Sequence, residues 1–290
     1  VSAGVGLDTL ELFGIGSGQV APLSSTFNGD SGNDTLRVHS TADSTATIFN
    51  TGTVTLNGGL GDDLFQLFSL ANTVDGIGGP VVVDGTDGIV GGNTDSLVIV
   101  DTGDTTTDSV FINAVNPGVS DDYRVEGINS AVGNDVTFRN IDALDYTGTQ
   151  AADQIDARFI NTTPQHDLTT VSLSGWLGGD QFLLFTSDQV GGSGPGVTPT
   201  GTPSGVANIS LYGDAPGNPN AGDGNDVFGE TPALPFTGTG ITNVGLLVPD
   251  TTRMIRPSVS TGIAIDGGQP TGLAAPLGDV VGDVHNVDIS

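Results

Sequence analysis

An aspartate recurs five residues after a glycine in three short segments of the chain, and an apolar residue follows each aspartate two positions later. The three pairs are Gly29 and Asp34, Gly58 and Asp63, and Gly175 and Asp180. A carboxylate in a glycine turn can accept a hydrogen bond from a backbone N–H, or it can bind a cation. In the segment TLNGGLGDDLF (55–65) a second carboxylate, Asp62, stands beside Asp63. The repulsion between these two charges must be offset by open solvent or by a cation.

Looser copies of the same unit have longer turns. In these copies Asp95 follows Gly85, and Asp226 follows Gly213. Each copy, tight or loose, lies between two runs of β-forming residues, so a strand, a glycine turn and a second strand form the repeated unit.

The runs that flank the turns must supply the strands that hold them in place. Apolar and polar residues alternate in these runs with the period of two that is typical of strands. We expect the following residues to point into a core: Leu36, Val38, Leu56, Phe65, Leu67, Leu97, Ile99, Phe182, Leu184, Ile209 and Leu211. No convincing amphipathic helix pattern occurs, so the sequence predicts an all-β protein.

Repeated strands and glycine turns are typical of units that stack on one another. We therefore predict a repetitive parallel β-solenoid, or β-helix, with residues 1–290 as a single array. The alternative is a set of tandem β-sandwich domains; the variable turn lengths favour the solenoid, because insertions can leave one edge of the stack. Residues 191–205, a glycine- and proline-rich stretch, are the candidate domain boundary. Because both ends of the chain lie within the repeat pattern, we expect a part of a longer protein or of a polymer.

The charge of the chain limits the classes of partner. The formal net charge is −28, with 34 acidic residues against six lysines and arginines. Such a chain lacks the cationic footprint of a nucleic-acid-binding protein, and divalent cations would relieve its self-repulsion. Cysteine is absent, which excludes disulfides and thiolate metal sites. No apolar run reaches the length of a membrane span.

The turns resemble the calcium-binding nonapeptide GGxGxDxUx, in which U is apolar, of hemolysin-type (RTX) secreted bacterial proteins. The segment GGLGDDLFQ (58–66) matches this pattern in full, whereas Asp30 and Trp176 replace the second glycine in two other copies. In that family the turn carbonyls and the aspartate carboxylate bind Ca²⁺, which neighbouring coils share. The resemblance thus implies candidate calcium ligands in this chain: Asp34, Asp63, Asp95, Asp180 and Asp226, with turn carbonyls near Gly29, Gly58 and Gly175.

The spacing of the copies differs from that family, which places its nonapeptides in immediate tandem. Here the closing aspartates stand 26 or more residues apart, as from Asp8 to Asp34. A shared ion therefore requires long coils that stack in register. The alternative is a set of metal-free turns, in which each aspartate accepts a hydrogen bond from the backbone of its own turn.

These observations favour an extracellular structural or adhesive repeat protein of a bacterial surface, part of a fibre, sheath, surface layer or giant adhesin. We expect self-association from end to end. One alternative is a calcium-dependent module that binds glycans or another surface, and a second is a β-solenoid polysaccharide lyase or hydrolase. We do not expect an enzyme, because the three histidines are isolated and no nucleophile or metal motif accompanies them.

Overall fold

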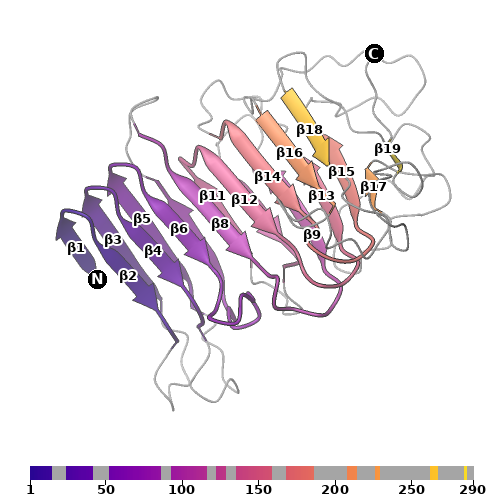
Figure 1. The fold of residues 1–290 in the computed structure, drawn as a ribbon. Coiled ribbons are helices and arrows are strands. Elements are labelled where there is room, and N and C mark those ends of the chain that lie inside the picture. Colours follow the sequence, from indigo (N-terminus) through magenta and orange to yellow (C-terminus); the bar gives the residue numbers. More distant parts are fainter. Residues whose placement is uncertain are drawn as a thin grey trace.

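The computed structural model describes eleven stretches of the chain. These are residues 1–14, 24–41, 52–85, 93–115, 122–128, 135–158, 168–185, 208–213, 226–228, 262–266 and 284–285. Within them all regular structure is β, which confirms the predicted class, and no helix suited to crossing a membrane occurs there. The strands stack side by side in two layers, and outside β9, β10 and β11 they follow chain order from the N-terminal end (Figure 1). The candidate domain boundary at residues 191–205 lies outside the described residues.

Two sheets make up the fold. The large sheet has 11 strands in the order β1 (Ser2–Val5), β3 (Ser25–Ser31), β5 (Val54–Leu60), β7 (Val81–Asp84), β11 (Val136–Arg139), β10 (Tyr123–Glu126), β9 (Ser109–Ala114), β13 (Gln154–Arg158), β15 (Gln181–Phe185), β17 (Val227–Phe228) and β19 (Val284–His285). The small sheet has 8 strands in the order β18 (Gly262–Asp266), β16 (Asn208–Tyr212), β14 (Thr170–Ser174), β12 (Ala143–Thr147), β8 (Ser96–Val100), β6 (Leu64–Leu67), β4 (Thr35–Val38) and β2 (Thr9–Leu12).

Outside β9–β11 the chain alternates between the two sheets, and each strand lies parallel to the strands before and after it in its own sheet. Leu36 of β4, for example, lies opposite Leu10 of β2 and Phe65 of β6. We call one strand of each sheet and the turn that joins them a rung. Mostly parallel sheets of this kind are compatible with a β-helix or solenoid. They do not suit the tandem β-sandwich alternative, whose sheets are antiparallel.

One antiparallel insertion interrupts the alternation. After β8 the chain enters the large sheet with β9, reverses through β10 and returns as β11. β11 lies parallel to β7, and β9 lies parallel to β13. The small sheet meanwhile places β12 directly beside β8. The large sheet therefore gains strands at this point. The insertion divides the stack into two halves, one with strands β1–β8 and one with strands β12–β19.

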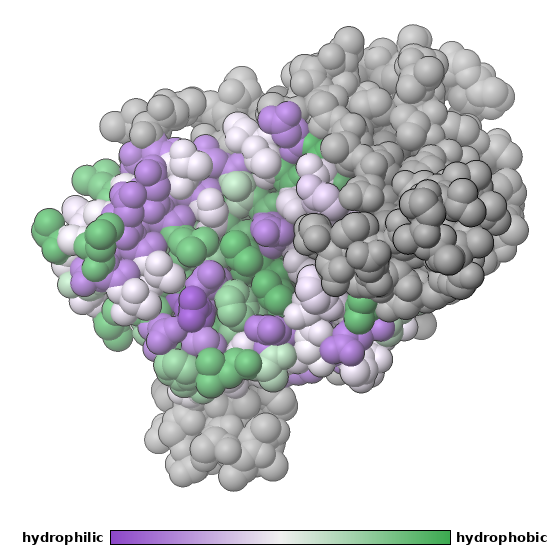
Figure 2. Space-filling view, in the orientation of Figure 1, coloured by the Kyte–Doolittle hydropathy of each residue, from purple (hydrophilic) through white to green (hydrophobic). Residues whose placement is uncertain are grey.

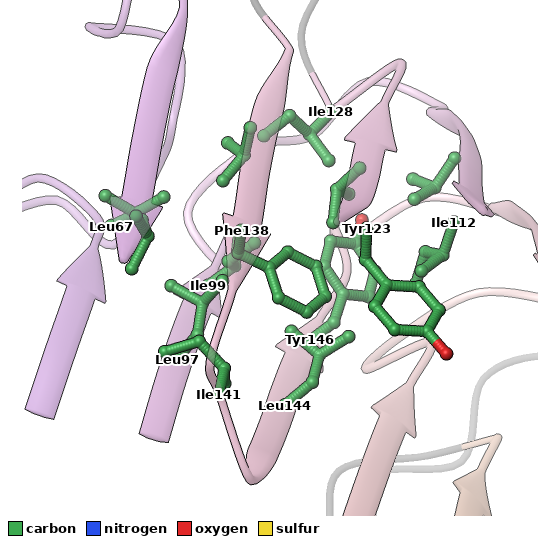
Figure 3. Packing of buried hydrophobic residues seen from close by; sticks show 14 of the residues in the cluster. Leu67, Leu97, Ile99, Ile112, Tyr123, Ile128, Phe138, Ile141, Leu144 and Tyr146 are labelled. Atoms are coloured by element: carbon green, nitrogen blue, oxygen red, sulfur yellow. The ribbon is translucent and has the colours of Figure 1, made fainter. Parts of the chain in front are cut away.

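The core lies between the sheets and consists of the residues that alternate inward. All eleven predicted core residues are buried, with at most 1% of their surface exposed. Figure 3 shows Leu97 and Ile99 of β8 beside Phe138 of β11. Within the insertion the rings of Tyr123 and Phe138 stack with centroids 5.5 Å apart. The apolar rows run along the stack, because parallel register places equivalent residues of neighbouring rungs opposite one another.

A pair of neighbouring substitutions in β8 tests this register. Leu97 is fully buried, whereas Val98 is half-buried on the outer face. Leu97→Ala should lower the free energy of unfolding by about 2–5 kcal/mol, because it leaves a cavity in the core. Val98→Ala should lower it by about 1 kcal/mol at most. Denaturant unfolding of the two variants measures the difference, and equal effects would contradict the inward position of Leu97.

Candidate functional site

The five predicted calcium ligands lie at two opposite edges of the stack. Asp34, Asp63 and Asp95 close turns that lead from the large sheet to the small one. Asp180 and Asp226 close turns that lead back from the small sheet to the large one. All five side chains are buried, with 2% or less of their surface exposed. Copies of one sequence motif therefore lie at two opposite edges of the stack in the tertiary structure.

At the first edge the carboxylates form a ladder of hydrogen bonds between rungs. Each closing aspartate accepts the backbone N–H of the closing aspartate in the preceding rung. The bonds run from the Asp8 N–H to Asp34 (2.8 Å), from Asp34 to Asp63 (2.7 Å), from Asp63 to Asp95 (2.7 Å) and from Asp95 to Asp142 (2.8 Å). We call this series the first ladder. The donor of each of these hydrogen bonds lies in the neighbouring rung, and not in the aspartate's own turn.

A second ladder follows the opposite edge. Its bonds run from the Asp108 N–H to Asp153 (2.8 Å), from Asp153 to Asp180 (2.7 Å) and from Asp180 to Asp226 (2.9 Å). Asp153 also accepts the backbone N–H of Thr149 in its own turn (2.7 Å). A buried carboxylate that accepts several N–H groups is stabilised in its charged form. The ladder bonds thus give these aspartates a structural role in joining the rungs.

The glycine of the motif makes room for the carboxylate that closes the turn. A Cβ atom at Gly58 would lie 2.2 Å from Oδ2 of Asp63, and one at Gly175 would lie 1.8 Å from Oδ2 of Asp180. Both distances are far shorter than any van der Waals contact. The spacing of five residues is therefore a steric requirement, since only glycine allows the aspartate to fold back over its Cα.

The turn carbonyls near these glycines face the neighbouring rung. A Cβ atom at Gly29 would lie 2.5 Å from the carbonyl oxygen of Gly58, and one at Gly148 would lie 3.0 Å from that of Gly175. Rungs therefore approach closely at the turns. The second position of the nonapeptide needs a left-handed backbone, and Asp30 and Trp176 adopt it with φ angles of 74° and 78°. These two residues keep the turn of the RTX-like pattern without its glycine.

A separate group of three carboxylates lies in residues 101–108, the turn between β8 and β9. Ligand oxygens of Asp101, Asp104 and Asp108 all lie within 4.8 Å of one another, so this group could hold a metal ion. Asp101 and Asp108 are 0% and 6% exposed, and Asp104 is half-buried. Asp108 follows Gly103 by the five residues of the glycine–aspartate motif, whereas Asp101 and Asp104 lie outside that motif.

The surroundings raise the pKa values of two of these carboxyls, Asp101 and Asp108. Burial is the largest cause, and the negative charges of neighbouring aspartates add to it. The pKa of Asp101 rises to about 7 and that of Asp108 to about 8, while burial raises the pKa of Asp153 to about 6. Without a bound cation, Asp101 and Asp108 therefore keep their protons at pH values where an exposed aspartate is ionised.

Sequence reasoning missed several members of these sites. Asp153 follows Gly148 by the same five residues as in the tight copies, so the signal was present in the sequence. Asp142 has no opening glycine, and only the pairing of β12 with β8 reveals its place in the first ladder. In the group at residues 101–108, Asp108 follows Gly103 by the same five residues, while Asp101 and Asp104 are marked only by the local density of aspartate.

The chain matches no protein-family model, no curated protein and no solved structure.

A substitution at Asp63 tests the first ladder against a purely local turn. Asp63→Ala leaves the buried N–H of Asp34 without its acceptor, which should cost about 1–3 kcal/mol of unfolding free energy. Asp62→Ala, one residue away, removes a charge whose partners are exposed and should change stability by about 0.5 kcal/mol or less. Chemical denaturation in EDTA measures both values, and similar effects for the two variants would refute the ladder.

The raised pKa values predict a pH dependence for the metal-free protein. The folded state binds protons that the unfolded state has released, so stability is full below the ordinary aspartate pKa. It should fall once the pH passes the ordinary aspartate pKa of about 4, and the fall should end at about 6 to about 8, where Asp153, Asp101 and Asp108 ionise in the folded state. Asp108→Asn should flatten this fall, since the new amide does not ionise. Melting temperatures in EDTA check the slope, and parallel curves for the two proteins would exclude these carboxyls as its cause.

Proposed function

We propose that the chain is an extracellular structural or adhesive repeat protein of a bacterial surface, built as a parallel β-solenoid and able to extend into a fibre. The observation that carries the proposal is the parallel stacking of rungs, which the two ladders of hydrogen bonds hold in register. The secreted bacterial setting rests on the resemblance of the turns to RTX repeats and on the net charge of −28. Calcium is the stabilising cation in this proposal.

The first ladder can accept a further rung at Asp8. Each later ladder aspartate accepts an N–H from the rung before it, and among the described residues the Asp8 carboxylate has no donor. The carbonyl of Asp8 accepts the N–H of Thr35 in β4, and the carbonyl of Leu12 accepts the N–H of His39 just after β4. Since successive residues of a strand alternate in direction, the backbone groups of Thr9 and Glu11 face the open side. The edge therefore presents the pattern that one further parallel strand would complete.

Apolar side chains accompany this open edge. Val5 and Leu7 are 91% and 82% exposed, and Val1 and Phe13 are also exposed. Leu10 continues the inward row of Leu36, which is fully buried, yet Leu10 itself remains half-buried. Figure 2 shows hydrophobic residues at the left end of the stack, where β1 and β2 lie in the same view of Figure 1. Covering this end would bury the last members of the apolar rows.

A second copy of the chain can supply a rung that pairs with the edge strands β1 and β2. The opposite end of the stack has β18 at the edge of the small sheet and β19 at the edge of the large sheet. If these strands pair with β2 and β1 of another copy, both sheets continue in parallel and a backbone N–H reaches Asp8. Such a head-to-tail contact does not close on itself and generates an open filament. This geometry supports a structural role in a fibre, sheath or surface layer.

Two substitutions at Thr9 test the proposed contact. Thr9→Pro removes an N–H that faces the open side and leaves the pairing of β2 with β4 intact, so it should block association. Thr9→Ala keeps this N–H and should associate like the original chain. Sedimentation over a range of concentrations and electron microscopy of the polymers report the result.

Ordered polymers from the original chain and from Thr9→Ala, with monomers from Thr9→Pro, would support the fibre. Stable monomers of the original chain at all concentrations would contradict it. That result would favour the alternative of a calcium-dependent module that binds glycans or another surface, which a glycan-binding screen can then examine.

A further inference from the structure

The turn between β8 and β9 has carboxylate oxygens that the protein leaves without donors. Oδ1 of Asp101 accepts the backbone N–H of Val74 (3.1 Å), but the buried Oδ2 of Asp101 has no hydrogen-bond partner. The buried Oδ2 of Asp108 has no donor either while both carboxyls are ionised; when one of them is protonated, Asp101 and Asp108 share a side-chain hydrogen bond. Buried carboxylate oxygens are expected to be satisfied by a donor or a cation. The ladder residue Asp34 also keeps a buried Oδ2 without a partner, so this turn differs from the ladders in gathering three carboxylates within reach of one ion.

A buried phenol provides an independent sign of an unfilled place. The Tyr146 side chain is fully buried, and its hydroxyl has no hydrogen-bond partner. Burial raises the pKa of Tyr146, and the charges of Asp153, Asp108 and Asp101 raise it further. The hydroxyl therefore lies near the same carboxylates. A phenol in this position can donate its proton to a carboxylate that binds a metal, or to a water on the metal.

No cationic side chain of the described residues neutralises the group. The ion pairs of arginine involve Glu11, Asp84, Glu126, Asp135 and Asp156, none of which belongs to it. A further carboxylate, Asp75, interacts with Asp101 and Asp104 and adds to the negative charge. A hard cation would offset this charge and would supply the missing partner for both Oδ2 atoms.

We propose that Asp101, Asp104 and Asp108 form a calcium site that fastens together the two halves of the stack. This inference deepens the calcium part of the proposed function and does not depend on fibre formation. Oxygens within 4.8 Å of one another fit around one Ca²⁺ ion, whose ligands lie at about 2.4 Å and can thus stand about 4.8 Å apart across the ion. Octahedral Mg²⁺, with ligands at about 2.1 Å, would require the turn to contract.

The contacts of the turn explain how one ion could act on both halves. On one side, Asp101 accepts the Val74 N–H and Gly103 donates to the carbonyl of Asn72, both in the connection between β6 and β7. On the other side, Gln150 donates to the carbonyl of Asp104, and the Asp108 N–H donates to Asp153. The first partners precede the antiparallel insertion and the second follow it. An ion held by the turn therefore stabilises the junction where the sheets differ in strand number.

Calorimetric titration of the EDTA-stripped chain with calcium chloride tests the site. Asp104→Asn removes the half-buried ligand with little risk to folding, and Asp108→Asn removes a buried one. Asp30→Asn is the matched control, because it removes one charge at an exposed position and asparagine also tolerates its left-handed backbone. Both ligand variants should raise the Kd for calcium by at least about tenfold, while Asp30→Asn should leave it within about twofold.

Terbium luminescence supplies a second measurement that does not depend on stability. Terbium, which occupies calcium sites, should be sensitised by Tyr146, so Tyr146→Phe should reduce the emission while calorimetry still detects calcium binding. Asp104→Asn should reduce both signals. The proposal is overturned if the original chain binds no calcium at millimolar concentration, or if Asp104→Asn, Asp108→Asn and Asp30→Asn bind it equally. Polymers of Asp104→Asn in EDTA would show that assembly stands even where this site is absent.

Discussion

The hydrogen bond from the N–H of one closing aspartate to the carboxylate of the next fixes the arrangement of the other parts of each rung. It requires a glycine five residues earlier, because the carboxylate lies over the Cα atom of that residue in the turns of Gly58 and Gly175. It also fixes parallel register, since equivalent turns must lie directly over one another. A slip of one residue would break the ladder and would turn the apolar rows of Leu36, Phe65 and Leu97 outward. Turn chemistry and core packing therefore specify the same alignment.

The same interaction explains how a chain with so few cations can bury so many carboxylates. Backbone N–H groups favour the charged form of a buried carboxylate, as the donors from Asp108 and Thr149 do at Asp153, although burial still raises the pKa of Asp153 to about 6. Burial raises the pKa of Asp101 to about 7 and that of Asp108 to about 8. The group at residues 101–108 differs from the ladders because three of its carboxylates can reach one ion. A high density of aspartate in the sequence does not by itself distinguish these two cases.

The middle of the stack is its irregular place. There β9, β10 and β11 widen one sheet but not the other, so the adjoining turns join two halves of the stack. Regular rungs give the molecule length, and in our proposals a further rung extends it while the turn between β8 and β9 holds an ion.

The sequence by itself determined the all-β class, the inward rows and the turn motif, because strand alternation and the Gly29–Asp34 type of spacing are local properties. All eleven predicted core residues proved to be buried for that reason. It could not reveal that Asp63 and Asp180 lie on opposite edges, since the direction of each turn depends on which sheet the chain has just left. Nor could it reveal Asp142 as a ladder residue, or that the charges of Asp101 and Asp108 act on the buried hydroxyl of Tyr146. These relations arise between segments far apart in the chain, and only the stacking of rungs brings them together.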